Sequence, residues 1–571
     1  MDFQHPYLTR QLIAYIGNKR SLLSFLAPVF SELAGRARVR RFLDPFAGSG
    51  AVARLAKYMG FEVEAADLEH YAWVLNAAAL EVEAGERDEC FRELGGLSEA
   101  IETFHAIGAA AAEAADAAAA GSHDRSYIAR HYAPAETGGA DYRRERLFYT
   151  AENARYIDAV RNAIEDYYPG RQLSDRERKA KLLLLSALLF EASTHANTSG
   201  VFKAYHKGFG GHGKDALSRI MAPMRLEEPP LVDGTWACRA EERDAAEFLA
   251  GRAADLVYLD PPYNSHQYGS NYFMLNTIAR WDKPEVSAER DEHGRLARKA
   301  GIREDWTETR SDFCSKARAE GAFERVLDSI DARFIVLSYS TDGVVPLERL
   351  VELLSERGRV ELFGTDYVQY RGGRQSISRS TKNIEFAIAV TTGERASSGG
   401  LTTPADSKRI RRFFLEREVA SLLRDCYVPD RVREHFDCEE NRLMLPGGIE
   451  LEMPRLFRFE SSQAELAAVA EEHLPVIRDR LQTARCRDRR EEARVLISLL
   501  RDAHVTASER RAYHDQLLRA LRKFAYRKYA GEFEGVAEEI EAACRTHPER
   551  FAGVGEGLSE LRALARRRFE G

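Results

Sequence analysis

The chain has 571 residues, which is too long for one compact core, so we expect two to four domains. Hydrophobic residues make up 44% and charged residues 30%, and no apolar run reaches the ~18 residues of a membrane span. The formal charge of −7 neither suggests nor excludes a polyanionic partner, because a nucleic-acid surface can be basic locally. Seven scattered cysteines without a C-x-x-C pair, and a first segment unlike a signal peptide, predict a cytoplasmic protein without a disulfide framework, metal site or membrane contact.

The first region, residues 1–84, alternates between helical and strand patterns. Residues 20–33 have helical spacing, residues 40–46 form a short strand, residues 50–60 a helix that Gly60 ends, and residues 61–67 a second strand. This order is how a doubly wound, Rossmann-like α/β domain begins.

The second region, residues 85–230, interrupts that alternation. An alanine-rich tract at 107–121 predicts a surface helix or a poorly ordered linker, and residues 178–193 predict a buried helix. A loop rich in glycine, histidine and lysine follows at 195–215. We expect this region to be a helical insertion.

The α/β pattern resumes in residues 231–395. Strands are expected at 253–260, 332–340, 358–370 and 382–390, with a helix at 346–358. The last region, residues 396–571, is expected to be a mainly helical domain, with capping boxes at 462–465 and 506–509.

A glycine-rich turn follows the first strand, in the sequence "FLDPFAGSGAVARLA". Gly48 and Gly50 let the backbone approach a ligand closely, and the helix that begins behind them favours a carboxylate or a phosphate. The alternative is a plain tight turn, and the pattern is neither G-x-G-x-x-G nor a P-loop. Asp67, at the end of the next strand, can accept hydrogen bonds from both hydroxyls of a ribose. S-adenosylmethionine, a nucleoside with a carboxylate end, suits such a site.

A second motif, "DPPY", ends the strand at 253–260. The carboxylate of Asp260 and the carbonyl of Pro261 can both accept hydrogen bonds from an exocyclic amino group. Tyr263 offers a ring on which a flipped base can stack, which is worth about 1–3 kcal/mol. The lone pair of the amine can then be aimed at the methyl group of a nearby sulfonium, so that positioning supplies most of the catalysis.

Three motifs, "YIGNK" (15–19), "DPFAGSG" (44–50) and "DPPY" (260–263), stand in this order. Together they resemble an amino-group-methylating DNA methyltransferase, and most closely the adenine-N6 enzymes whose cofactor motifs precede the catalytic motif. The resemblance covers roughly residues 10–80 and 180–392. It implies S-adenosylmethionine as cofactor, duplex DNA with a flipped adenine as substrate, and a role in restriction–modification or phage defence beside a nuclease or another defence partner.

The resemblance also implies roles for single residues. Tyr15 and Lys19 match the motif that closes over the cofactor, with Lys19 facing its carboxylate. The residues matching the rest of the cofactor site are Asp44, Phe46, Gly48 and Gly50 around the methionine part, Asp67 at the ribose, and Asp244 at the adenine. A helix cap is an equal alternative for Asp244. The catalytic motif comprises Asp260, Pro261, Pro262 and Tyr263.

Two basic stretches are candidate DNA contacts. In the insertion, where such enzymes carry their target-recognition region, they are Lys203, His206, Lys207 and Lys214; between two late strands they are Arg371, Arg374, Arg379 and Lys382. A solvated flexible loop is the alternative for the first stretch. A metal site is disfavoured there, because His206 and His212 lack companion ligands. Residues 264–273 follow the catalytic motif. The sequence leaves open which of them line a pocket for the base and which pack in the core.

Other functions stay open at this stage. Methylation of RNA adenine or of DNA cytosine N4 uses the same motif chemistry, and a non-catalytic regulator could keep the same scaffold. The region 396–571 can extend the DNA footprint, form a dimer or dock a partner.

Overall fold

The computed structural model divides the chain into two compact units, Met1–Asp406 and Ser407–Gly571. In the first unit the structure describes residues 1–114, 125–170, 172–211, 216–340, 343–364 and 385–393. In the second it describes residues 412, 415–416, 418–419, 422–423, 426–439, 442–445, 449–452, 466, 469–502, 505–522, 524–525 and 529–570.

A seven-stranded sheet forms the centre of the first unit, in the order β3-β2-β1-β4-β5-β7-β6. Its strands are β1 (Arg41–Asp44), β2 (Glu62–Asp67), β3 (Arg239–Glu242), β4 (Ala253–Leu259), β5 (Asp331–Ser340), β6 (Gly358–Gly364) and β7 (Glu385–Thr392). Neighbours pair in parallel except β7, which runs antiparallel to β5 and β6. The carboxyl-terminal parts of β1, β4 and β5 are buried, as expected for strands covered by helices.

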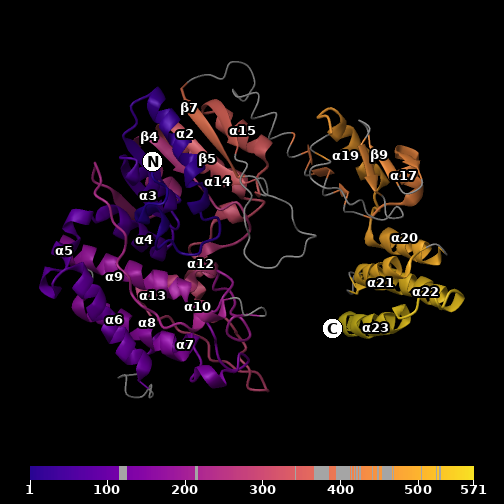
Figure 1. Ribbon diagram of the computed structural model, residues 1–571, viewed down its shortest axis with the longest axis horizontal. Helices are drawn as coiled ribbons and strands as arrows, with labels where there is room; N and C mark the ends of the chain where they lie inside the picture. The colour runs from indigo at the N-terminus through magenta and orange to yellow at the C-terminus, as the bar shows by residue number, and fades with distance from the viewer. Residues whose placement is uncertain are drawn as a thin grey trace. The chain divides into compact units, whose positions relative to one another are not determined.

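One group of helices belongs to the α/β core with this sheet, and a second group forms the insertion. Those of the α/β core are α1 (Pro6–Thr9), α2 (Leu23–Arg36), α3 (Ala51–Tyr58), α4 (His70–Glu81), α11 (Ala245–Leu249), α12 (Tyr268–Asn271), α13 (Phe273–Arg280), α14 (Ala319–Asp328) and α15 (Leu347–Ser355). Those of the insertion are α5 (Arg87–Cys90), α6 (Leu97–Glu113), α7 (Tyr127–Tyr132), α8 (Ala151–Tyr167), α9 (Asp175–Thr194) and α10 (Leu217–Met221). Figure 1 shows α6, α8 and α9 side by side below the sheet, and α9 also packs on α4 and α13. Sheet and insertion therefore share one hydrophobic core.

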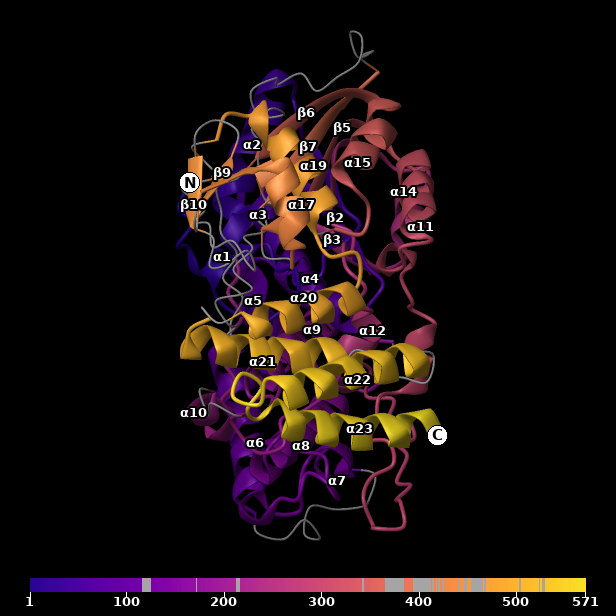
Figure 2. The same ribbon diagram turned by 90° about the vertical axis from the view of Figure 1, so that its right-hand side faces the viewer.

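The second unit has its own hydrophobic cores. It contains α17 (Pro429–His435), α19 (His473–Ala484), α20 (Arg489–Arg501), α21 (Ala507–Arg522), α22 (Ala530–Thr546) and α23 (Val554–Glu570), with an antiparallel sheet of β8 (Asp437–Glu439), β9 (Arg442–Leu445) and β10 (Ile449–Glu452). Figure 2 shows α20 to α23 stacked in rows. The capping box expected at 506–509 is present, because Thr506 and Glu509 exchange hydrogen bonds.

The fold class expected from the sequence is confirmed: a mostly parallel, Rossmann-like α/β sheet with many helices. The strands expected near 40–46, 61–67, 253–260 and 332–340 form as β1, β2, β4 and β5. β3 and the small sheet β8–β10 were not predicted, because their strands are only three or four residues long. The buried helix expected at 178–193 is α9, which begins with a capping box between Ser174 and Glu177. Among the described helices, none is long and apolar enough to cross a membrane.

Candidate active site

Three carboxylates meet at one edge of the sheet. Asp44 ends β1, Asp67 ends β2 and Asp260 follows β4, and these three strands are parallel neighbours. Because parallel strands end at the same edge, their carboxyl ends open on one crevice. That crevice holds a cavity, which is lined by the segments 15–19, 44–52, 67–69, 243–246, 260–263 and 309–313, among others.

The glycine-rich turn has the backbone that its sequence predicts. Gly48 and Gly50 adopt φ angles of +50° and +81°, which favour glycine. A Cβ on Gly48 would lie 2.9 Å from the Tyr15 ring, and one on Gly50 would lie 2.9 Å from Oδ1 of Asn76. Two hydrogen bonds stabilise the turn: Asn76 Nδ2 donates to the Gly48 carbonyl, and Gly48 N–H donates to the Asp67 carboxylate.

The segment 15–19 is held by the loop that follows the catalytic motif. The ring of Tyr15 stacks on Tyr272, with 5.0 Å between centroids, and lies tilted against Tyr268 at 5.1 Å. Ile16 N–H donates to the Tyr272 hydroxyl, while the Tyr268 hydroxyl donates to the Ile16 carbonyl. These two tyrosines therefore position the segment 15–19.

Lys19 pairs with Asp260. Its ammonium lies 2.9 Å from the Asp260 carboxylate, and the side chains are 3% and 17% exposed. Lys19 also donates to the Gly17 carbonyl and lies 5.1 Å from the centre of the Tyr263 ring. The pairing joins the first and third motifs directly. The expected contact of Lys19 with a cofactor carboxylate stays a prediction.

The cavity floor concentrates negative charge. Burial, and then the nearby charge of Asp260, hold the pKa of Asp44 well above its ordinary value. Burial raises the pKa of Asp67 to about 6, against the opposing effect of hydrogen bonds from Glu69 and Gly48 N–H groups. A cation in this cavity would stabilise the ionised forms of both Asp44 and Asp67.

Tyr263 is buried at the catalytic motif. Its carbonyl accepts a hydrogen bond from Val344 N–H, and its ring meets Tyr339 edge to face at 5.7 Å. Lys19 and Gly17 also lie beside the ring, and Tyr263 as a whole is 7% exposed. Stacking on a base would therefore require one of these neighbours to move aside.

Comparison with known proteins agrees with this geometry. Residues 15–291 match the family described as D12 class N6 adenine-specific DNA methyltransferase. The Type II methyltransferase M.NlaIII of Neisseria lactamica is 28% identical over 378 residues, which cover 65% of this chain and 96% of that protein. The Type II methyltransferase M.CviAII of Paramecium bursaria Chlorella virus 1 is 28% identical over 382 residues, 66% of this chain and 98% of that protein.

The chain is an adenine-specific DNA methyltransferase, and its residues 15–291 are similar to the D12 class. The resemblance predicted from three motifs is thereby confirmed. The modification methylase StsI of Streptococcus sanguinis is 26% identical over 404 residues, 69% of this chain and 54% of that protein. No solved structure matches the chain.

The remaining predicted residues of this methyltransferase lie as follows. Phe46 lines the cavity, and so does Asp244, which also caps α11 by accepting from the N–H groups of Ala246 and Glu247. Lys203 and Lys207 are exposed on the loop that Asn197 anchors, and His206 is half-buried beside Gly211. The predicted contacts outside the described residues are Lys214, Arg371, Arg374, Arg379 and Lys382.

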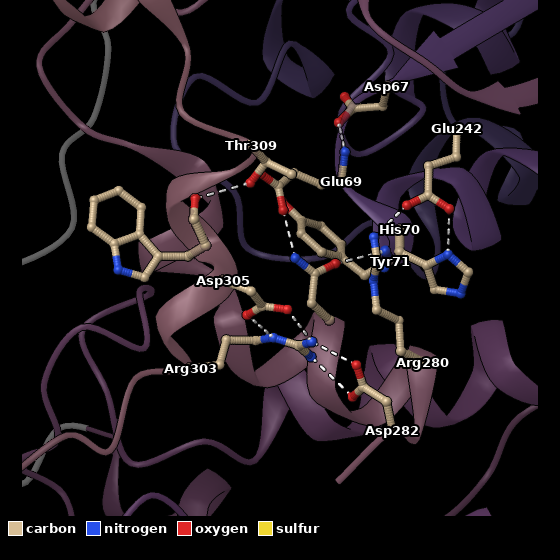
Figure 3. A network of polar contacts seen from close by, with 12 residues as sticks. Asp67, Glu69, His70, Tyr71, Glu242, Arg280, Asp282, Arg303, Asp305 and Thr309 are labelled. Atoms are coloured by element: carbon tan, nitrogen blue, oxygen red, sulfur yellow. Dashed lines mark hydrogen bonds and ion pairs between the residues drawn. The ribbon is translucent and has the colours of Figure 1, made fainter. Parts of the chain in front are cut away.

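Some residues of the methyltransferase site lie outside the three motifs. Asn76 supports the glycine turn from α4, and Glu69 lies buried at the cavity wall, where burial raises its pKa to about 7. Figure 3 shows Glu69 close to Thr309, with Arg303 between Asp282 and Asp305 beside them. Thr309 belongs to the segment 309–313, which lies far along the chain from every motif and reaches the cavity through tertiary contacts alone. The sequence "DLE" at 67–69 is the one local hint of Glu69.

Proposed function

We propose that this methyltransferase transfers the methyl group of S-adenosylmethionine to N6 of an adenine in a specific duplex sequence. We place it in the cytoplasm as the modification enzyme of a restriction–modification system, with a nuclease as its counterpart. The observation that carries the proposal is the convergence of the Asp44, Asp67 and Asp260 strand ends on one cavity with the glycine turn. The names of the relatives, Type II methyltransferases and modification methylases, support the setting.

The residues of the cavity fit the cofactor. Two glycines with positive φ leave room for a close approach to the backbone, and the buried Asp44 favours a positively charged guest. When bound, the cofactor supplies an electrophilic methyl group on a sulfonium. We assign the glycine turn and Asp44 to its charged end, Asp67 to its ribose and Asp244 to its adenine.

The catalytic motif would receive the target base. A base buried in a duplex is out of reach, so the adenine is taken out of the stack. The Asp260 carboxylate and the Pro261 carbonyl then accept hydrogen bonds from the two N–H groups of the amine, which loses one proton only after it is methylated, and Pro262 keeps the turn rigid before Tyr263. Lys19 fixes the Asp260 carboxylate in place before the base arrives.

Exposed cations of the insertion would contact phosphates. Lys207 Nζ lies 5.8 Å and the Arg143 guanidinium 5.4 Å from the centre of the Tyr142 ring. The Tyr205 hydroxyl donates to the Tyr142 carbonyl, which joins the loop of Lys203 and Lys207 to this segment. Among the described residues, none of these three cations has an ion-pair partner. We name Lys203, Lys207 and Arg143 the insertion cation cluster.

The test is transfer of labelled methyl from S-adenosylmethionine to duplex DNA, single-stranded DNA or RNA, followed by identification of the modified nucleoside. We expect N6-methyladenine in duplex DNA. Asp260→Asn removes the charge and keeps the shape, and it should lower transfer by about 100-fold or more while cofactor binding persists. Glu356→Gln, an exposed carboxylate of the same domain, is the matched control. Absence of transfer to all three nucleic acids would overturn the proposal.

A further inference from the structure

A segment beyond the catalytic motif forms a wall of the cofactor cavity. We propose that residues 309–313 bind the adenosine part of the cofactor and that Gln267 is the residue that positions them. The inference rests on the proposed function and extends it, because none of the motifs includes this segment.

The segment lies beside the glycine turn at the cavity. Thr309, Arg310, Ser311, Asp312 and Phe313 all line the cavity. The buried ring of Phe313 meets Phe46 of the glycine turn edge to face, with 5.3 Å between centroids. It meets Phe323 of α14 in the same way at 5.0 Å. Phe313 is thus a rigid apolar surface beside the turn that would hold the cofactor.

The chemistry of this end of the cavity suits a purine. Ala245, Ala246, Ala322 and Val326 line the same cavity, and Ala322 and Val326 belong to α14, whose Phe323 contacts Phe313. Arg325 also lies here, but its guanidinium is paired with Asp312 at 2.7 Å. A cavity lined by these apolar side chains, an aromatic ring and Asp244 can hold a flat ring and accept a hydrogen bond from its amino group. The charged end of the cofactor belongs instead with Asp44.

Gln267 joins the segment 309–313 to the loop that follows Tyr263. Ser311 N–H donates to Gln267 Oε1 at 2.9 Å, and Gln267 Nε2 donates back to the Ser311 carbonyl at 3.0 Å. A second clamp joins the Cys314 thiol to the His266 carbonyl. The fit is close, since a Cβ on Gly269 would lie 2.6 Å from Oγ1 of Thr309. These contacts attach the wall of the cavity to the loop that follows Tyr263.

The experiment measures binding to the full chain by calorimetry, with two probes. S-adenosylmethionine reports the whole cofactor, and 5′-methylthioadenosine reports its nucleoside part alone. Phe313→Ala and Gln267→Ala should weaken both probes by about tenfold or more. Phe313→Leu and Gln267→Glu should bind both probes with affinities between those of the alanine variants and the wild type. The first keeps apolar volume, and the second keeps the acceptor for Ser311 N–H. Glu308→Gln, at the residue just before the segment and outside the cavity lining, should bind as the wild type does.

The outcomes separate the two claims. If Phe313→Ala and Gln267→Ala bind both probes as the wild type does, the inference is wrong and the proposed function stands. Weakening of S-adenosylmethionine without weakening of methylthioadenosine would also overturn it, because the segment would then serve the other end of the cofactor. A wild-type chain that binds neither probe would overturn the proposed function itself.

A second measurement covers variants that fail to fold. Arg310 and Lys316 are exposed trypsin sites within or beside the segment. In the wild type, S-adenosylmethionine and methylthioadenosine should both slow cleavage there, by about tenfold at saturation. Cleavage at an unchanged rate would overturn the inference.

Discussion

Lys19 and Asp260 form a nearly buried ion pair at the point where the first and third motifs meet. Removing one partner leaves the other charge unpaired in the protein interior, which typically costs about 3–5 kcal/mol. We therefore expect Lys19→Ala to lower both the melting temperature and the rate of methyl transfer. Lys19→Arg, which keeps the charge, should retain more of each. Calorimetry and single-turnover kinetics would measure the two effects.

The double variant is the control for this prediction. Lys19→Ala combined with Asp260→Ala removes both charges, so it should melt at a higher temperature than Lys19→Ala alone. If the double variant is less stable than the single one, the carboxylate is not the partner that Lys19 compensates.

Glu69 is a second residue whose burial has a measurable consequence. Burial raises its pKa from an ordinary value of 4.5 to about 7 in the folded chain. The folded state therefore binds the proton more tightly than the unfolded state, and this contribution to stability is lost as the pH rises through about 7. It amounts to up to about 3 kcal/mol.

Glu69→Gln tests this dependence, because the amide keeps the shape and cannot ionise. The stability of the wild type relative to Glu69→Gln should fall as the pH rises from about 5 to 8 and then level off. Urea unfolding of both proteins across this range measures the difference. A difference that stays constant with pH would show that Glu69 is ionised throughout.

At the scale of elements, the turn between β1 and α3 depends on its glycines. A Cβ on Gly48 would press on the Tyr15 ring at 2.9 Å, and φ is +50° there. Gly48→Ala should therefore push the segment 15–19 away and weaken cofactor binding by about tenfold or more.

Gly35 in α2 offers a matched control. A Cβ on it would meet nothing within 4 Å, and the residue is helical. Gly35→Ala should leave cofactor binding unchanged and raise stability by about 0.5–1 kcal/mol. Equal cofactor affinity in both variants would contradict the role given to the turn.

The insertion cation cluster makes a prediction about salt. Each phosphate contact adds about 0.9 to the slope of log K against log salt for duplex DNA. Replacing Lys203, Lys207 and Arg143 together by alanine should lower that slope by about 2–3, with kcat at saturating DNA unchanged. The control replaces Arg92, Arg178 and Arg349, which changes the net charge equally but removes cations already paired with carboxylates. An equal change of slope in both variants would show a net-charge effect instead of contacts.

The sequence predicted those elements whose causes are local. β1, β2 and β4 are short strand-forming segments that each end at an acidic residue or a turn. These strands, and the sheet edge at which Asp44, Asp67 and Asp260 meet, could therefore be predicted. The pairing of Lys19 with Asp260 could not be predicted. The sequence shows that Lys19 is charged, but it does not show which distant carboxylate the fold brings next to it. The segment 309–313 has no motif, and its position depends on Gln267 and on packing against Phe46. β3 was missed because four mostly polar residues have too short a pattern.

The whole molecule consists of two units with separate cores. One core cluster lies within the α/β sheet and the insertion, and the clusters of Ser407–Gly571 contain residues of that unit alone. The matching family covers residues 15–291, all within the first unit. M.NlaIII aligns over 378 residues that make up 96% of its length, which is less than the 406 residues of Met1–Asp406. That relative is therefore too short to hold full counterparts of both units.

We accordingly expect residues 1–406 alone to fold and to transfer methyl groups. A domain with its own hydrophobic core can fold independently, and every residue assigned to the cofactor and the base lies in this unit. Its kcat should lie within about threefold of that of the full chain, while KM for DNA can rise if the second unit adds contacts. Cofactor binding, thermal unfolding and methyl transfer would be compared between residues 1–406 and the full chain. The same fragment with Asp260→Asn is the inactive control, and residues 407–571 alone should give a cooperative helical unfolding transition. A folded fragment of residues 1–406 that binds the cofactor but transfers no methyl group would show that the second unit contributes to catalysis.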